Sequence, residues 1–246
     1  MTAQGLIDTT EMYLKAAYEL EEDGVVPLRA RIADRLEQSP PTVSQTVARL
    51  QRDGLLLVGE DRRLELSPEG RRIAVRVMGK HRLAETLLYR VIGLDWARLH
   101  AEACRWEHVM SDEAARRIFD LCGGPRFSPY GGPIPGLDFL GVPGLSPVSA
   151  PPGRRPATHP GRREVRLHRI SERIQDDAAF LGTLLAAGLT PGARVTLTPV
   201  EGCRVEMRTP TAAVVLDRRQ ASMLIVCDPV APDSAATARA RCVAAP

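Results

Sequence analysis

A stretch rich in proline and glycine divides this chain of 246 residues into two unequal parts. Proline fixes φ and lacks a backbone donor, so a segment interrupted this often cannot be regular helix or sheet throughout. We therefore expect helical structure before the stretch and a separate small domain after it. The stretch runs from Gly123 to Gly161 and includes Pro129, Pro133, Pro135, Pro143, Pro147, Pro151 and Pro152.

The first 75 residues alternate helical periodicity with turn signals. We expect one helix capped by Thr9 or Thr10, a short helix over about residues 29–36, and a third over 42–52 that follows two prolines. Two short helices joined by a tight turn are typical of a helix-turn-helix. The polar positions of the second of these two carry Thr42, Ser44, Gln45 and Arg49.

Strand-like residues follow at 55–58 and 63–66, with Gly59–Arg62 between them as a hairpin turn. A hairpin after a helix-turn-helix is the wing of a winged helix. We therefore predict a winged-helix DNA-binding domain over residues 1–75. An unrelated helical bundle with a hairpin is the alternative.

Potential metal ligands recur at helical spacing in the next part of the chain. On a helix that turns 100° per residue, the four residues of the first set lie within an arc of roughly 100°. Imidazole, thiolate and carboxylate together suit a transition-metal dication better than apolar packing, although a polar helix contact is the alternative. A second pair shares one face of the preceding helix at i, i+4. The first set is His100, Cys104, Glu107 and His108, and the pair is His81 and Glu85.

Apolar positions along a long helix from Ser67 to about Ile92 and along the helices after it favour a dimer interface. We assign residues 76–145 to a helical dimerisation and metal-binding domain and 146–163 to a linker. Alternating segments over 164–230 fit a small β-barrel. Residues 231–246 lack periodicity and are expected to be disordered.

Composition and charge indicate where in the cell the protein is located, but they say little about its function. The net charge of +3 is uneven, with a net of −5 over residues 1–26 and +5 over 27–82. Nothing resembles a membrane span of eighteen apolar residues or a signal peptide. The odd count of five cysteines argues against a disulfide framework, so we expect a cytoplasmic protein with reduced thiols.

Six segments together resemble the iron-dependent repressor family of the diphtheria toxin repressor type. The resemblance is dense over about residues 6–145 and loose over 164–200. It implies an α+β, mainly helical fold with a winged helix-turn-helix, a helical dimerisation domain and an SH3-like small β-barrel. The segments are DTTEMYL (8–14), YELEE (18–22), PLRARIA (27–33), PTVSQTVAR (41–49), KHRLAE (80–85) and EACRWEHVMSDE (102–113).

The resemblance implies two metal sites in each subunit. The primary site would use the side chains of Met12, Cys104, Glu107 and His108, completed by the Cys104 carbonyl and a water. The ancillary site would use His81, Glu85, His100, Glu172 and Gln175. An anion beside the ancillary site would contact Arg82 and Ser128, although Gly132 stands where the family usually has asparagine.

The resemblance also implies the contacts to double-stranded operator DNA. Base edges would be read by Ser39, Pro41 and Gln45. Phosphates, which set register without reading sequence, would be held by Thr9, Arg29, Thr42, Ser44 and Arg52. Pro40 stands where the family often has glycine.

The implied function is a homodimeric, Fe²⁺-activated transcriptional repressor that controls genes of iron uptake and homeostasis, not an enzyme. Whether one dimer or two dimers bind each operator is left open. Fe²⁺ is favoured by the thioether and thiolate donors, while Co²⁺, Ni²⁺, Mn²⁺ or Zn²⁺ could bind in vitro. The rivals are a manganese- or zinc-responsive repressor of the same architecture, a metalloenzyme that uses the His/Cys/Glu helix, and a regulator whose metal is merely structural.

Overall fold

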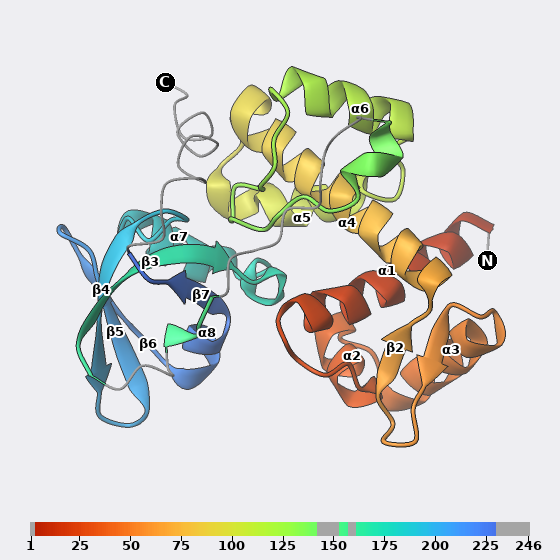
Figure 1. Cartoon of the computed structure of the whole chain (residues 1–246), viewed down its shortest axis with the longest axis horizontal. Coiled ribbons are helices and arrows are strands. Elements are labelled where there is room, and N and C mark those ends of the chain that lie inside the picture. Colours follow the sequence, from red (N-terminus) through yellow and green to blue (C-terminus); the bar gives the residue numbers. More distant parts are fainter. Residues whose placement is uncertain (1–2, 142–152, 157–160, 230–246) are drawn as a thin grey trace.

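The computed structural model describes residues 3–141, 153–156 and 161–229, with backbone only for residues 3–8. These residues form three lobes, and helix α4 runs from the first lobe into the second (Figure 1). Most of the predicted linker (146–163) and all of the predicted tail (231–246) lie outside the described residues. Among the described helices, none combines the length and apolar composition needed to cross a lipid bilayer.

The first lobe has the predicted winged-helix order of elements. Ser39 caps α3, the second helix of the predicted helix-turn-helix, by accepting a hydrogen bond from the Thr42 amide, and two prolines occupy its first turn. The helix α1 begins before the expected Thr9 or Thr10 cap, because no proline interrupts the residues that precede it. The elements are α1 (Ala3–Glu22), α2 (Arg29–Leu36), α3 (Pro40–Arg52) and the antiparallel strands β1 (Leu56–Val58) and β2 (Leu64–Leu66).

The second lobe is helical, and its longest helix is shorter than the sequence predicts. The α-helical winding of α4 stops at Leu87, and the next five residues form a π-helix that ends at Gly93 with φ of 74°. Gly93 can take this left-handed conformation because it has no Cβ. The elements are α4 (Pro68–Leu87), η1 (Leu88–Ile92), η2 (Trp96–Arg98), α5 (Leu99–Trp106), α6 (Asp112–Leu121) and η3 (Leu137–Leu140).

The third lobe is a five-stranded antiparallel sheet in the order β6-β5-β4-β3-β7 with two helices. Its buried side chains form one hydrophobic core with those of the second lobe, whereas the first lobe has a core of its own. The elements are β3 (Arg163–Ile170), η5 (Glu172–Ile174), α7 (Ala178–Ala186), β4 (Arg194–Val200), β5 (Arg204–Arg208), β6 (Ala213–Leu216), α8 (Arg218–Ser222) and β7 (Leu224–Cys227).

Ion pairs at the carboxyl end of α1 join the first lobe to the other two. Glu22 accepts hydrogen bonds from Arg82 on α4, at 2.6 and 2.9 Å, and from Arg169 on β3, at 2.6 Å. Asp23 accepts from Arg169 at 2.8 Å and also from the Ser171 hydroxyl. The orientation of α1 is therefore tied to both α4 and the third lobe.

The contact between the second and third lobes depends on a glycine. Gly131 has φ of 84°, and a Cβ there would lie 2.2 Å from the carbonyl oxygen of His168 on β3. We expect Gly131→Ala to lower the free energy of unfolding by about 3 kcal/mol, because backbone strain adds to the steric clash. Urea unfolding measures the loss.

Gly141→Ala is the matched control. Gly141 has φ of 66° and nothing within 4 Å of an added Cβ, so only the backbone strain of about 1 kcal/mol applies. Equal losses in the two variants would contradict the close approach at Gly131.

Candidate metal centre

A buried cluster of polar side chains lies where α4, α5 and η5 meet. His81 and Glu85 face it from successive turns of α4, His100 from the first turn of α5, and Glu172 from η5. Their relative exposures are between 0 and 2%. Such polar groups are buried at a cost unless they are paired or bind a cation.

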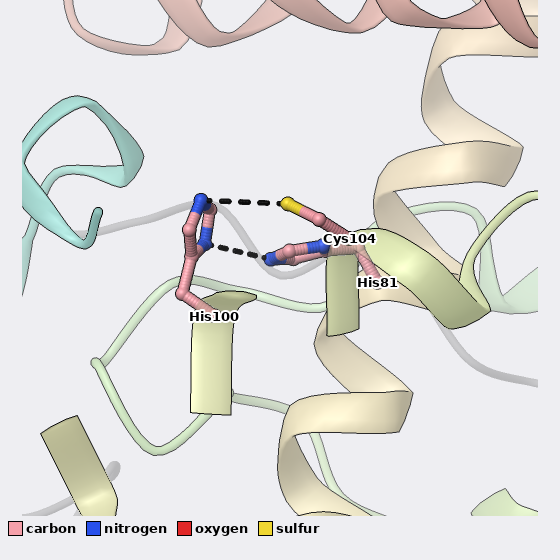
Figure 2. Close-up of side chains that lie close together, drawn as sticks. All are labelled: His81, His100 and Cys104. Carbon is pink, nitrogen blue, oxygen red and sulfur yellow. Dashed lines mark hydrogen bonds between the residues drawn. The ribbon is translucent and has the colours of Figure 1, made fainter. Parts of the chain in front are cut away.

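The nitrogen, sulfur and oxygen atoms of this cluster point toward one another. His100 lies between Cys104 and His81, with one ring nitrogen directed at each (Figure 2). The distances are 3.6 Å from His100 Nε2 to Cys104 Sγ and 3.1 Å from His100 Nδ1 to His81 Nε2. In two overlapping groups the donor atoms all lie within 4.8 Å of one another. One group is His81, His100 and Cys104, and the other is His81, Glu85, His100 and Glu172.

The donor set fits a divalent transition-metal ion. The buried oxygens Glu85 Oε2 and Gln175 Oε1 have no hydrogen-bond partner, while the Gln175 amide nitrogen donates to the Ile170 carbonyl at 2.9 Å. An unpaired buried acceptor is rare in folded proteins, and a bound cation or water satisfies it. Imidazole nitrogens with carboxylate and amide oxygens suit Fe²⁺, Mn²⁺, Co²⁺ or Zn²⁺.

The expectation that one helix carries all four ligands of the first set is wrong in part. Helix α5 ends at Trp106, so Glu107 and His108 occupy the turn that follows. The Glu107 backbone keeps helical angles, φ −56° and ψ −35°, so its side chain still turns into the centre. Glu107 Oε2 lies 2.5 Å from His81 Nδ1, and Glu107 Oε1 lies 3.1 Å from His108 Nε2.

Helix α1 contributes residues that sequence reasoning did not assign to the centre. The Lys15 ammonium donates to Glu107 Oε2 at 2.6 Å, and Glu11 Oε2 lies 2.6 Å from His108 Nδ1. Met12, the expected α1 ligand, is 37% exposed. The only signal for Lys15 in the sequence is that it is one of two lysines and stands in an otherwise acidic segment.

Electrostatics favour the metal-binding form of Cys104 and Glu107. Burial alone raises the pKa of the Cys104 thiol, but Lys15, His100 and His81 outweigh it and lower the pKa to about 6. Burial also opposes ionisation of Glu107, yet Lys15 and His81 hold its pKa well below the usual range. A thiolate and a carboxylate are the forms that bind metal.

Arg82, predicted to contact an anion, binds protein groups. Its guanidinium donates to Glu22, to the Pro133 carbonyl and to Glu172 Oε1 at 2.9 Å. A Cβ at Gly132 would lie 2.8 Å from Arg82 Cζ, so the absence of a side chain there leaves room for the guanidinium. The Ser128 hydroxyl accepts from the Tyr130 amide at 3.2 Å. The anion contact stays a prediction.

Asp176 is a further residue that the sequence did not indicate. Its carboxylate lies 3.3 Å from His100 Nε2 and 2.8 Å from Arg35 Nη1 on α2. Burial raises the pKa of Asp176, but the contacts with His100 and Arg35 lower it by more. The pKa of Asp176 therefore lies below its usual value. The loop after η5 thus connects the centre to the helix before the recognition helix.

The residues predicted to contact DNA lie on the surface of the first lobe. Val43, Val47 and Leu50 of α3 are buried, so the opposite side of this helix faces outward. Thr9 and Arg29 are partly exposed. The exposed members of the predicted set are Ser39, Pro41, Thr42, Ser44, Gln45 and Arg52.

Two family descriptions match this arrangement. Residues 5–64 match "Iron dependent repressor, N-terminal DNA binding domain", and residues 67–136 match "Iron dependent repressor, metal binding and dimerisation domain". The two matches together include α3 and the part of the cluster that lies on α4, on α5 and in the turn after α5. Glu172 and Gln175 lie outside them.

Relatives and solved structures agree with these matches. The iron-dependent repressor IdeR of Mycobacterium tuberculosis is 52% identical over 209 residues, which cover 83% of this chain and 90% of the relative. The diphtheria toxin repressor of Corynebacterium diphtheriae is 54% identical over 198 residues, which cover 80% and 87%.

Among solved structures, a manganese-dependent transcriptional repressor in complex with manganese has a TM-score of 0.75 at 27% identity and covers 89% of this chain and 99% of its own. IdeR of T. acidophilum has a TM-score of 0.71 at 28% identity, with coverages of 89% and 97%. The two relatives are named as repressors and the manganese-binding structure as a transcriptional repressor, and none of the three is named as an enzyme. The chain belongs to the iron-dependent repressor family of DNA-binding, metal-binding transcription regulators.

Proposed function

We propose that this protein is a homodimeric repressor that binds operator DNA when loaded with Fe²⁺ and controls genes of iron uptake and homeostasis. One observation carries the proposal: residues of the metal centre contact helix α1 of the DNA-binding lobe directly. Glu107 pairs with Lys15, and His108 pairs with Glu11. Occupancy of the centre therefore bears on the placement of the DNA-binding lobe.

Two sites are proposed for the metal in each subunit. The primary site consists of Met12, Cys104, Glu107 and His108, and the ancillary site of His81, Glu85, His100, Glu172 and Gln175. When bound, the cation supplies a coordinate cross-link between side chains of different lobes. Glu11 and Lys15 hold α1 against the end of α5, while Glu22 and Asp23 hold its other end against Arg82 and Arg169. A movement of α1 relative to the second lobe changes the spacing of the two recognition helices in a dimer.

Fe²⁺ is the proposed metal, with Mn²⁺ as the second candidate. The thiolate of Cys104 together with imidazole and carboxylate favours a borderline ion over the harder Mn²⁺. The names of the relatives at about 50% identity support iron. The manganese-dependent repressor that resembles this fold supports the second candidate.

A surface on the second lobe fits a second copy of the chain. Tyr89, Val91 and Ile92 of η1 and Leu121 of α6 are between 41 and 64% exposed. Arg90 donates to the Cys122 carbonyl at 2.8 Å, which places η1 beside the end of α6. Exposed apolar side chains gathered in this way favour a protein interface. We place the dimer in the cytoplasm, with access to the operator.

Glu107→Gln tests the function. We expect at least about a tenfold loss of Fe²⁺-stimulated binding to a duplex selected from random DNA by the loaded protein, because one ligand is removed. Anaerobic Fe²⁺ titration monitored by fluorescence anisotropy measures the effect, and circular dichroism checks the fold. His108→Ala should behave alike.

Glu113→Gln, at an exposed position on α6, is the matched control and should keep the wild-type response. A Glu107→Gln protein that gains full DNA affinity with Fe²⁺ would contradict the primary site. Wild-type affinity that does not depend on any metal would contradict the proposed function itself.

Gln45 and Arg52 should differ in their effect on DNA binding. Gln45→Ala should cost about 1 to 3 kcal/mol on the selected duplex only, because a base contact is lost. Arg52→Ala should weaken binding to all DNA and lower the slope of affinity against salt by about one, because a phosphate contact is lost. Salt titrations on selected and random duplexes compare them, and identical behaviour would contradict the two roles.

Glu11→Gln should change how stability depends on pH. Burial lowers the pKa of His108, but hydrogen bonds to Glu107 and Glu11 prevail and raise it from 6.5 to about 9. This contribution to stability is complete below pH 6.5 and is lost as the pH rises through about 9. The variant should lose part of that pH dependence in urea unfolding of the metal-free protein.

Glu102→Gln is the control for this measurement. Glu102 accepts a hydrogen bond from Trp106 Nε1 at 2.9 Å and pairs with Arg105. It should reproduce the wild-type profile of unfolding free energy against pH. The pairing of Glu11 with His108 is wrong if Glu11→Gln reproduces that profile as well.

A further inference from the structure

A lysine ammonium group lies among the side chains expected to bind the primary metal. Lys15 Nζ is 2.6 Å from Glu107 Oε2, 3.8 Å from Cys104 Sγ and 3.2 Å from His81 Nδ1. Lys15 is 5% exposed and comes from α1 of the DNA-binding lobe. A cation of the protein thus contacts donors from both proposed metal sites.

The ammonium and a divalent ion compete for the same groups. Glu107 Oε2 already contacts two partners, Lys15 and His81. A dication bonded to Glu107 Oε2 at about 2.1 Å would lie no more than about 5 Å from an ammonium that is 2.6 Å from the same oxygen. Repulsion between such charges is strong at this distance in a buried site of low dielectric constant.

We propose that Lys15 is a resident cation that holds the primary ligands in the metal-free protein and that the metal must displace, so that Lys15 sets the metal concentration needed for activation. The inference rests on the proposed metal centre. It adds a residue that lowers metal affinity while stabilising the metal-free state.

The structure offers the displaced ammonium another partner. Glu19 lies one turn further along α1, with Oε1 3.9 Å from Lys15 Nζ. The other oxygen of Glu19 is held by Arg35 on α2, at 2.7 Å. Moving toward Glu19 would take the ammonium away from Glu107 and would keep it paired within the first lobe.

Removal of the charge tests the proposal with Co²⁺ as the probe, because a Cys104 thiolate bound to Co²⁺ gives a charge-transfer absorption band. We expect Lys15→Met in the full chain to reach half-saturation at about tenfold lower free Co²⁺, because the repulsion is gone, when both proteins are titrated at a pH at which Cys104 is ionised. In the presence of a chelator, its thermal unfolding midpoint should fall, because Glu107 loses its partner. Lys15→Arg keeps the cation and should stay within about threefold of the wild-type Co²⁺ midpoint.

Lys80→Met is the matched control. Lys80 is the other lysine of the chain, and its ammonium donates to the Met110 carbonyl at 2.6 Å and pairs with Asp112. Its Co²⁺ midpoint should equal that of the wild type. A Lys15→Met midpoint equal to or higher than the wild-type midpoint would overturn the proposal.

A measurement on the unchanged protein guards against a variant that does not fold. With only two lysines, ¹⁵Nζ labelling gives two ammonium signals for NMR. Addition of diamagnetic Zn²⁺ should shift the Lys15 signal in proportion to occupancy and leave that of Lys80 in place. A Lys15 signal that does not respond to saturating Zn²⁺ would overturn the proposal.

The two proposals fail in different ways. Co²⁺ binding that tightens in Lys15→Met, without any effect of metal on DNA binding, would contradict the repressor function and support the role of Lys15. Metal-dependent DNA binding with equal Co²⁺ midpoints in wild type and Lys15→Met would do the reverse. No thiolate band in any of the proteins would contradict the primary site, and with it the role of Lys15.

Discussion

The ion pair between Lys15 and Glu107 joins the DNA-binding lobe to the turn after α5, and the placement of α1 depends on it. Both groups are almost fully buried, so neither can lose its partner without a large desolvation cost. The pair also lies at the edge of the cluster of histidines and carboxylates on α4, α5 and η5. A change of charge in that cluster therefore acts directly on α1, which shares the core of the first lobe with α3.

The opposite end of α1 is held by a second set of charges. Glu22 accepts hydrogen bonds from both Arg82 and Arg169, so one carboxylate contacts the second and third lobes together. Glu172 in turn lies between Arg82 and the histidines of the centre. The third lobe, which shares its core with the second, thus contacts both the buried histidine cluster and α1.

Much of the fold and part of the site could be predicted from the sequence, because local spacing determines them. The i, i+4 pair of His81 and Glu85 needs only a helix to share a face, and the winged helix needs only its turn residues and apolar period. Lys15 and Glu11 could not be found in this way, because a charged residue on an amphipathic helix is usually solvated. Lys15 is buried, and Glu11 half-buried, only by tertiary contacts with α4 and with the turn after α5. The end of α5 at Trp106 and the π-helical turn at η1 were likewise not indicated by the sequence pattern. The resemblance supplied Met12, Glu172 and Gln175, which no local pattern indicates.

We propose two distinct metal positions in each subunit, and the primary one connects α1 to the second lobe. Anomalous diffraction at the cobalt edge, from crystals grown with Co²⁺, tests it most directly. We expect two cobalt ions in each subunit, one bonded to Cys104 and Glu107 with the Lys15 ammonium moved away, and one bonded to His81, Glu85 and His100. A single ion shared by His81, His100 and Cys104, with Lys15 still paired to Glu107, would contradict it.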